Sequence, residues 1–167
     1  MNVSRILRSM VVGAATLGMV GLAGCAASTP DVVSAPAKVR QVTESSHCGL
    51  IGPGLLLVTS DAQLSKYLGL PAQNLATQQL RNVDLEREFL LFVTLGKKST
   101  SGYGVRLTSA EIHGDVLDIR AEVRSPPKDA ILAQVMTSPC AVLAVEPGNW
   151  NAIRVTGVGD SPLLLRP

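Results

Sequence analysis

The stretch from Arg87 to Leu107, REFLLFVTLGKKSTSGYGVRL, constrains the fold more than any other part of the chain. It begins with a nearly continuous apolar run, Phe89 to Leu95, which is typical of a strand buried on both faces. The run breaks into a polar turn that contains glycine, and the chain then resumes as an alternating strand. Because further strand-forming segments follow, the sequence predicts a sheet with 89–95 as a central strand.

The clearest hairpin in the sequence follows this stretch. Val116 to Arg124 alternates between apolar and charged residues, as expected for a strand with one buried face. Gly114-Asp115 is a hairpin turn that joins it to a partner strand at Tyr103 to His113. The apolar positions of that partner are odd-numbered in its first half and even-numbered in its second half. Since a slip of one residue turns side chains to the other face, this change predicts a β-bulge at Thr108-Ser109.

A helix is expected before the central strand. The strand Leu55 to Ser60 leads into it, and Ser60 and Gln63 have the spacing of a capping box. The apolar residues that share one face of this helix are Leu64, Tyr67 and Leu68. A second, short helix is expected at Leu75 to Arg81, with Asn74 as its cap.

Three more strands are expected in the C-terminal part of the chain: Ile131 to Met136, Ala141 to Val145 and Ala152 to Thr156. The expected fold class is therefore α+β, with a mostly antiparallel sheet of six to seven strands that resembles a sandwich or half-barrel. One or two short helices lie near the start of the domain. Residues 47–167 are expected to form this single domain, since roughly 120 residues is a usual domain size.

The N-terminus has the layout of a secretory signal peptide over residues 1–24, with Arg5 and Arg8 before an apolar run. The run is shorter than the roughly 20 apolar residues of a membrane span. It ends in Leu-Ala-Gly-Cys, which resembles the lipobox of bacterial lipoproteins; an ordinary cleaved signal is the alternative. The resemblance implies that Cys25 carries a diacylglycerol and palmitate anchor in the cell envelope. Ala26 in place of aspartate implies the outer membrane, facing the periplasm, if the host has two membranes.

Residues 25–46 are rich in small residues, serine, threonine and proline, and this composition predicts a flexible tether. Beyond Cys25 the chain carries 13 basic and 13 acidic residues, because Arg5 and Arg8 account for the excess of positive charge. This balance, without a basic stripe, argues against nucleic acid as a partner.

Two cysteines remain for the folded domain, Cys48 and Cys140. In an exported, oxidising compartment the simplest expectation is that they form a disulfide. Free thiols are an alternative, and so is a metal site that His47 and His113 would complete. Zinc sites usually take ligands in close pairs such as C-x-x-C, which this chain lacks, so no metal or other cofactor is expected.

The sequence offers little for catalysis. A nucleophile needs a neighbouring base, and the chain has only His47, at the edge of the domain, and His113, beside a hairpin turn. No common hydrolase, metalloprotease, phosphate-binding or dinucleotide-binding motif occurs. We therefore expect a protein that is not an enzyme.

Three short motifs belong together: Leu95-Gly96 at the end of the apolar strand, the turn Thr100-Ser101-Gly102-Tyr103, and Thr137-Ser138-Pro139 before the last apolar strand. With them the chain resembles, over about Leu55 to Val145, the C-terminal domain of the protease complex subunit PrcB family. Ser101 departs from the glycine that is usual there. The family's namesake is an accessory lipoprotein of a bacterial surface protease complex. The resemblance therefore implies an accessory, non-catalytic role in an envelope assembly.

One polar, cationic loop is a candidate interaction site because two strands hold it and glycine makes it adaptable. Its residues are Lys97, Lys98, Ser99, Thr100, Ser101, Gly102 and Tyr103. It also resembles the loop of chagasin-type cysteine-protease inhibitors, which implies inhibition through Lys98 to Tyr103. In the simplest interpretation Gly102 permits the turn and Tyr103 starts a strand. Trp150, at another turn, is expected to cover the core or to anchor a partner.

These observations predict a lipid-anchored envelope protein that binds or assembles with other proteins, an envelope protease among them. The chagasin-like inhibitor is one alternative. A purely structural lipoprotein without a specific partner is the other.

Overall fold

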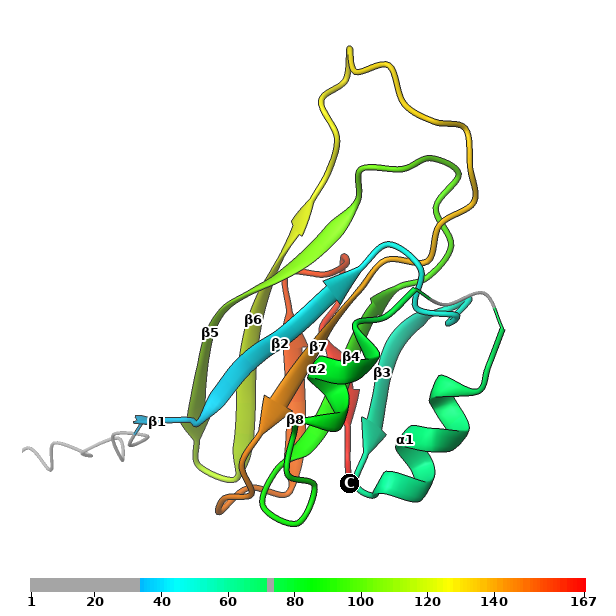
Figure 1. Ribbon diagram of the computed structural model, residues 1–167. Coiled ribbons are helices and arrows are strands. Elements are labelled where there is room, and N and C mark those ends of the chain that lie inside the picture. The colour runs from blue at the N-terminus through cyan, green and yellow to red at the C-terminus, as the bar shows by residue number, and fades with distance from the viewer. Residues whose placement is uncertain (1–33, 72–73) are drawn as a thin grey trace, which may run out of the picture. The chain divides into compact units, whose positions relative to one another are not determined.

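The computed structural model describes residues 34–71 and 74–167, which form two β-sheets and two short helices (Figure 1). The first sheet has the order β1-β5-β6-β8-β9, with β1 (Ser34–Pro36), β5 (Gly104–His113), β6 (Val116–Arg124), β8 (Ala152–Thr156) and β9 (Leu163–Leu165). The second has the order β2-β7-β4-β3, with β2 (Val39–Ser45), β7 (Cys140–Val145), β4 (Phe89–Leu95) and β3 (Pro53–Val58). Only β6 and β8 pair in parallel among the strands described. This confirms the predicted α+β class dominated by antiparallel sheet.

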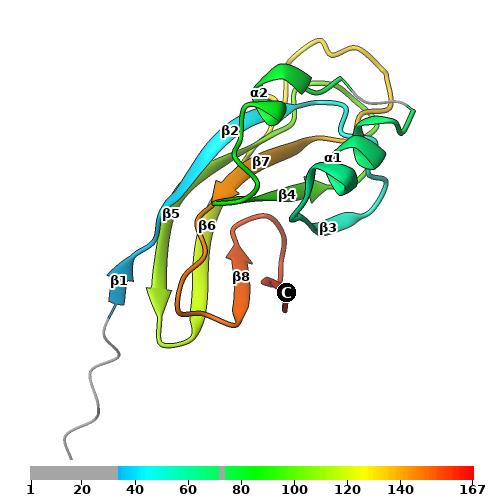
Figure 2. The ribbon, with the colours of Figure 1, turned by 60° about the horizontal axis from the view of Figure 1, so that its bottom comes forward.

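The elements form three layers, with β4 in the middle one. Its odd-numbered residues, from Phe89 to Leu95, pack between the two sheets against β6 residues such as Leu117 and Ile119. Its even-numbered residues, Leu90 and Phe92, pack on the other face under the helices. Figure 2 shows α1 (Asp61–Leu68) and α2 (Thr77–Arg81) on this side of the sheet. All seven residues of β4 are buried, so the predicted burial on both faces is confirmed.

The predicted hairpin is also confirmed. β5 and β6 pair from Gly104↔Arg124 to His113↔Val116, and their register shifts between Leu107 and Ser109, where the bulge was expected. Gly114 occupies the turn with a φ of 61°, which glycine adopts readily.

The helices differ from the prediction in their caps. The Ser60 hydroxyl accepts a hydrogen bond from the Gln63 N–H, at 3.4 Å, but the Gln63 side chain accepts from the Thr59 N–H rather than from that of Ser60. The second helix begins at Thr77 instead of Leu75, and Ala76 is its cap. Asn74 is not the predicted cap because it lies three residues before the start of the helix, where its N–H donates to the His47 carbonyl at 2.7 Å.

Two other predictions are wrong within the described residues. The predicted flexible tether includes residues 34–46, yet most of these residues belong to β1 and β2. The bulge between Gln41 and Thr43 breaks the alternation of β2, which hides the strand in the sequence. Ile131 to Met136 does not form the predicted strand, although it is free of turns and bends. The signal peptide, Cys25 and the start of the tether lie outside the described residues.

Candidate interaction site

Three connections meet at one end of the two sheets, and we call them together the loop end: residues 46–52, 96–103 and 125–139. The strand pairs Ser45↔Cys140, Pro53↔Leu95 and Gly104↔Arg124 bring the ends of six strands to this region. Figure 1 shows the longest connection, between β6 and β7, extending beyond the others. The loop that the sequence singled out, 97–103, is therefore one part of a larger surface.

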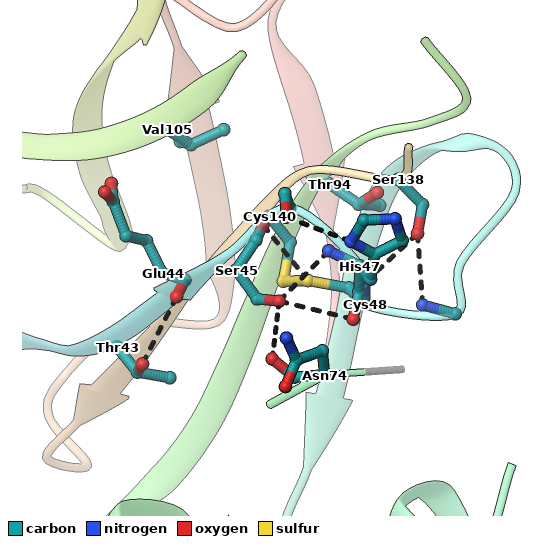
Figure 3. Close-up of a disulfide and its surroundings, with 12 residues drawn as sticks. Thr43, Glu44, Ser45, His47, Cys48, Asn74, Thr94, Val105, Ser138 and Cys140 are labelled. Atoms are coloured by element: carbon teal, nitrogen blue, oxygen red, sulfur yellow. Dashed lines mark hydrogen bonds between the residues drawn. A yellow bond between two sulfur atoms is a disulfide. The ribbon is translucent and has the colours of Figure 1, made fainter. Parts of the chain in front are cut away.

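A disulfide fixes the base of the loop end. Cys48 and Cys140 are joined, with their Cα atoms 6.1 Å apart, and both side chains are fully buried (Figure 3). This confirms the predicted disulfide and rules out both cysteines as free thiols or metal ligands in this state. The bond closes a long loop with a sequence separation of 92. In the chain-entropy model such a loop contributes about 4 kcal/mol to stability.

Ser138 connects two of the loops next to the disulfide. Its hydroxyl oxygen accepts hydrogen bonds from the Cys48 N–H at 3.0 Å and the Gly49 N–H at 3.2 Å (Figure 3). Its own N–H donates to the Ser46 carbonyl at 2.8 Å. Residues 46–52 and the end of 125–139 are therefore held in one position relative to each other. The backbone carbonyl of Cys48 also accepts a bond from the Tyr67 hydroxyl of α1, and burial raises the pKa of Tyr67 to about 12.

The loop 97–103 is held on one side by residues 125–139. Lys98 and Thr137 exchange two backbone hydrogen bonds of 2.9 Å, and the Ser101 N–H donates to the Ala133 carbonyl at 3.2 Å. The Lys98 ammonium lies 5.3 Å from the centre of the Tyr103 ring. Lys97, Ser99 and Gly102 remain exposed. The sequence predicted an exposed loop between two strands but missed this third support, because it lies far along the chain.

Most of the exposed apolar side chains belong to the connections of the loop end. They are Ile131, which is fully exposed, Ile51 at 72%, Met136 at 60% and Val135 at 46%. These are four of the six exposed large apolar residues in the described part of the chain. Single exposed apolar residues are ordinary, but their concentration in one region of the chain makes the loop end the candidate contact surface.

The other sequence candidates lie elsewhere. Trp150 contacts Phe89 edge to face, with ring centres 5.5 Å apart, at the end of β4 away from the loop end. It packs against the core between the sheets, as a cover for that core would. His47 lies at the loop end with its Nδ1 3.0 Å from the Ser46 hydroxyl, while His113 pairs with Glu111 at 3.2 Å in β5. Within residues 34–71 and 74–167, no three acidic, histidine or cysteine residues are grouped as metal ligands.

One ion pair stands out on the outer face of the first sheet. Arg154 of β8 donates two hydrogen bonds to the carboxylate of Asp118, its direct neighbour on β6. These hydrogen bonds lower the pKa of Asp118, and the charge of Arg154 acts in the same direction. The pair ties the two parallel strands together and lies outside the loop end.

The described residues thus define a β-sandwich with a helical third layer and a disulfide-braced group of loops at one end. Residues 89–146, which run from β4 to the residue after β7, match the family model described as PrcB C-terminal. The match confirms the resemblance seen in the sequence, and it includes two of the three connections of the loop end. No curated protein and no solved structure matches the chain.

Proposed function

We propose that this protein is a lipid-anchored component of the cell envelope that binds an envelope protease through its loop end and performs no catalysis itself. The observation that carries the proposal is the group of exposed apolar and cationic side chains on loops held by a buried disulfide. A rigid support with exposed loops is a common arrangement for binding sites. The family match supports the choice of a protease complex as the partner.

The anchor is tested by Cys25→Ser, which removes the thiol that would receive the lipid. The full-length protein is expected in the membrane fraction of cells, and the variant is expected in the soluble fraction or retained with its signal peptide. Among the described residues no helix has the length and hydropathy to cross a membrane. Recovery of the Cys25→Ser variant in the membrane fraction, with its signal peptide removed, would contradict the lipid anchor.

The accessory role is tested by co-purification from detergent-solubilised membranes. Ile131→Asp places a charge on the fully exposed apolar residue of the loop end. It is expected to reduce the amount of co-purifying protease strongly without loss of folding. The matched control is Leu164→Asp in β9, where the original side chain is 72% exposed but lies outside the loop end. Equal recovery of the protease with both variants would argue against binding through this surface.

A second candidate function is inhibition of a cysteine protease by Lys98 to Tyr103. The observation that favours this function is the pair of backbone hydrogen bonds between Lys98 and Thr137, which fixes the loop. Inhibitory loops bind more tightly when their conformation is fixed in advance. Nanomolar inhibition of papain, lost in Ser99→Trp, would favour this function over the accessory role. Absence of both inhibition and co-purification would leave the purely structural lipoprotein.

A further inference from the structure

The segment Ile131 to Met136 has the composition of a strand but pairs with no strand in the described part of the chain. Its sequence, ILAQVM, contains no glycine, proline or charge. No turn or bend interrupts it, and from Ala133 to Thr137 the chain runs antiparallel to residues 98–101, to which it is hydrogen-bonded at both ends. An extended segment that lacks a neighbour on one side is an open edge for strand pairing.

Hydrogen bonds to the loop 97–103 define where the backbone groups of this segment point. The Ala133 carbonyl accepts from the Ser101 N–H, and Thr137 exchanges two bonds with Lys98. In extended backbone the N–H and C=O of one residue point to the same side, and those of the next residue point to the opposite side. Ala133 and Thr137 therefore direct backbone groups at the loop. By this alternation the backbone N–H and C=O groups of Leu132, Gln134 and Met136 point away from it, while the Leu132 side chain lies near Gly102.

The outward groups are unpaired. Within residues 34–71 and 74–167, the backbones of Leu132, Gln134 and Met136 make no hydrogen bond. They present donors and acceptors at every second residue, which is the spacing of an antiparallel or parallel ladder. The exposed side chains of Ile131, Val135 and Met136 add apolar surface along the same segment.

The charge of the loop end favours an acidic partner segment. Its ionised residues are Lys97, Lys98, Lys128 and Asp129, which leaves an excess of positive charge. None of the three lysines forms an ion pair with another described residue. Charges of this kind favour complementary partners more than they add affinity.

We propose that Ile131 to Met136 accepts an extended, apolar and acidic peptide segment of a partner protein as an added β-strand. This inference rests on the proposed function, because it assigns the chemistry by which the loop end holds its partner. Main-chain bonds to Leu132, Gln134 and Met136 supply the ladder, and the apolar side chains contact alternate residues of the peptide. The lysines favour acidic residues beside the apolar ones.

The test uses the full-length protein in detergent micelles and a random-peptide library displayed on phage as the probe. Apolar, acidic peptides selected on the wild-type protein are expected to bind Gln134→Pro about tenfold more weakly or worse, because proline removes an outward N–H. Ala133→Pro is the matched control. It removes an N–H that faces the loop and keeps the carbonyl that accepts from Ser101, so its affinity should stay close to wild type.

A second measurement needs no variant of the protein and decides the matter if the proline variants fail to fold. N-methylation of a selected peptide at successive backbone amides should abolish binding at alternate positions only. Three outcomes overturn the proposal: no apolar, acidic peptide is selected, binding ignores both Gln134→Pro and N-methylation, or sedimentation shows that this edge pairs with a second copy of the chain. If a protease is nevertheless captured at the loop end in cells, only the strand addition fails and the proposed function stands.

Discussion

Gly157 is the residue at which a single added methyl group should damage the fold most. It follows β8 with a φ of +85°, and an added Cβ would overlap the backbone carbonyl of Ala121 on β6. We expect Gly157→Ala to lower the free energy of unfolding by more than about 2 kcal/mol, since positive φ alone costs about 1–2 kcal/mol. Urea unfolding of the detergent-solubilised protein measures this loss.

The control for that substitution is Gly159→Ala, two residues further on. Nothing lies within 4 Å of an added Cβ at this position, so the change should stay within about 0.5 kcal/mol. Equal stability of the two variants would show that the close approach of Gly157 to β6 is not required.

Asp118 makes stability depend on pH. Its hydrogen bonds with Arg154 hold its pKa in the folded protein below the ordinary value. The stabilisation is therefore complete above the pKa of the unfolded chain and is lost as the pH falls through the lower folded pKa. Asp118→Asn should unfold at a lower urea concentration than wild type at pH 7, and the difference should shrink in strong acid.

The control for this pH dependence is Glu122→Gln, on the same strand. Glu122 is exposed and forms no ion pair with a described residue. The Glu122→Gln variant should therefore unfold at nearly the same urea concentration as wild type. A difference for Asp118→Asn that persists unchanged in strong acid would contradict the assigned ion pair.

At the scale of elements, the disulfide is expected to hold the loops rather than the sheets. The double substitution Cys48→Ala and Cys140→Ala should cost about 2–4 kcal/mol of stability. Amide hydrogen exchange should accelerate first in 46–52 and 125–139, which Ser138 and Cys140 connect. Uniform acceleration over β4 and β6 would mean instead that the disulfide supports the whole domain equally.

The elements also show how far the sequence predicts this fold. The central strand, the hairpin and the bulge at Thr108-Ser109 follow from local alternation, which the sequence displays directly. β2 was missed because its bulge disrupts the alternation and because its residues read as a tether. The strand at Ile131 to Met136 was predicted from composition alone, whereas a strand needs a partner and the described chain provides none. Composition therefore indicates that a segment favours a strand, but it does not show whether another strand lies beside it.

The candidate site was only partly predictable for the same reason. The sequence identified the loop 97–103 from its glycine, charge and flanking strands. It did not show that Thr137 and Ala133 would support that loop, since these contacts depend on pairing between distant segments. The disulfide was the one long-range contact that could be predicted, because only two cysteines remained to form it.

At the scale of the whole molecule, the central proposal is that the loop end of a lipid-anchored envelope protein contacts a protease. The most direct test is crosslinking in intact cells from a photo-reactive residue at Ser99, which is exposed in the loop end. A probe at Ala62, exposed in α1 beyond the other end of β3, is the control. We expect the probe at Ser99 to capture an envelope protease and the probe at Ala62 not to. Capture of no protease from Ser99, or of the same proteins from both positions, would contradict this proposal.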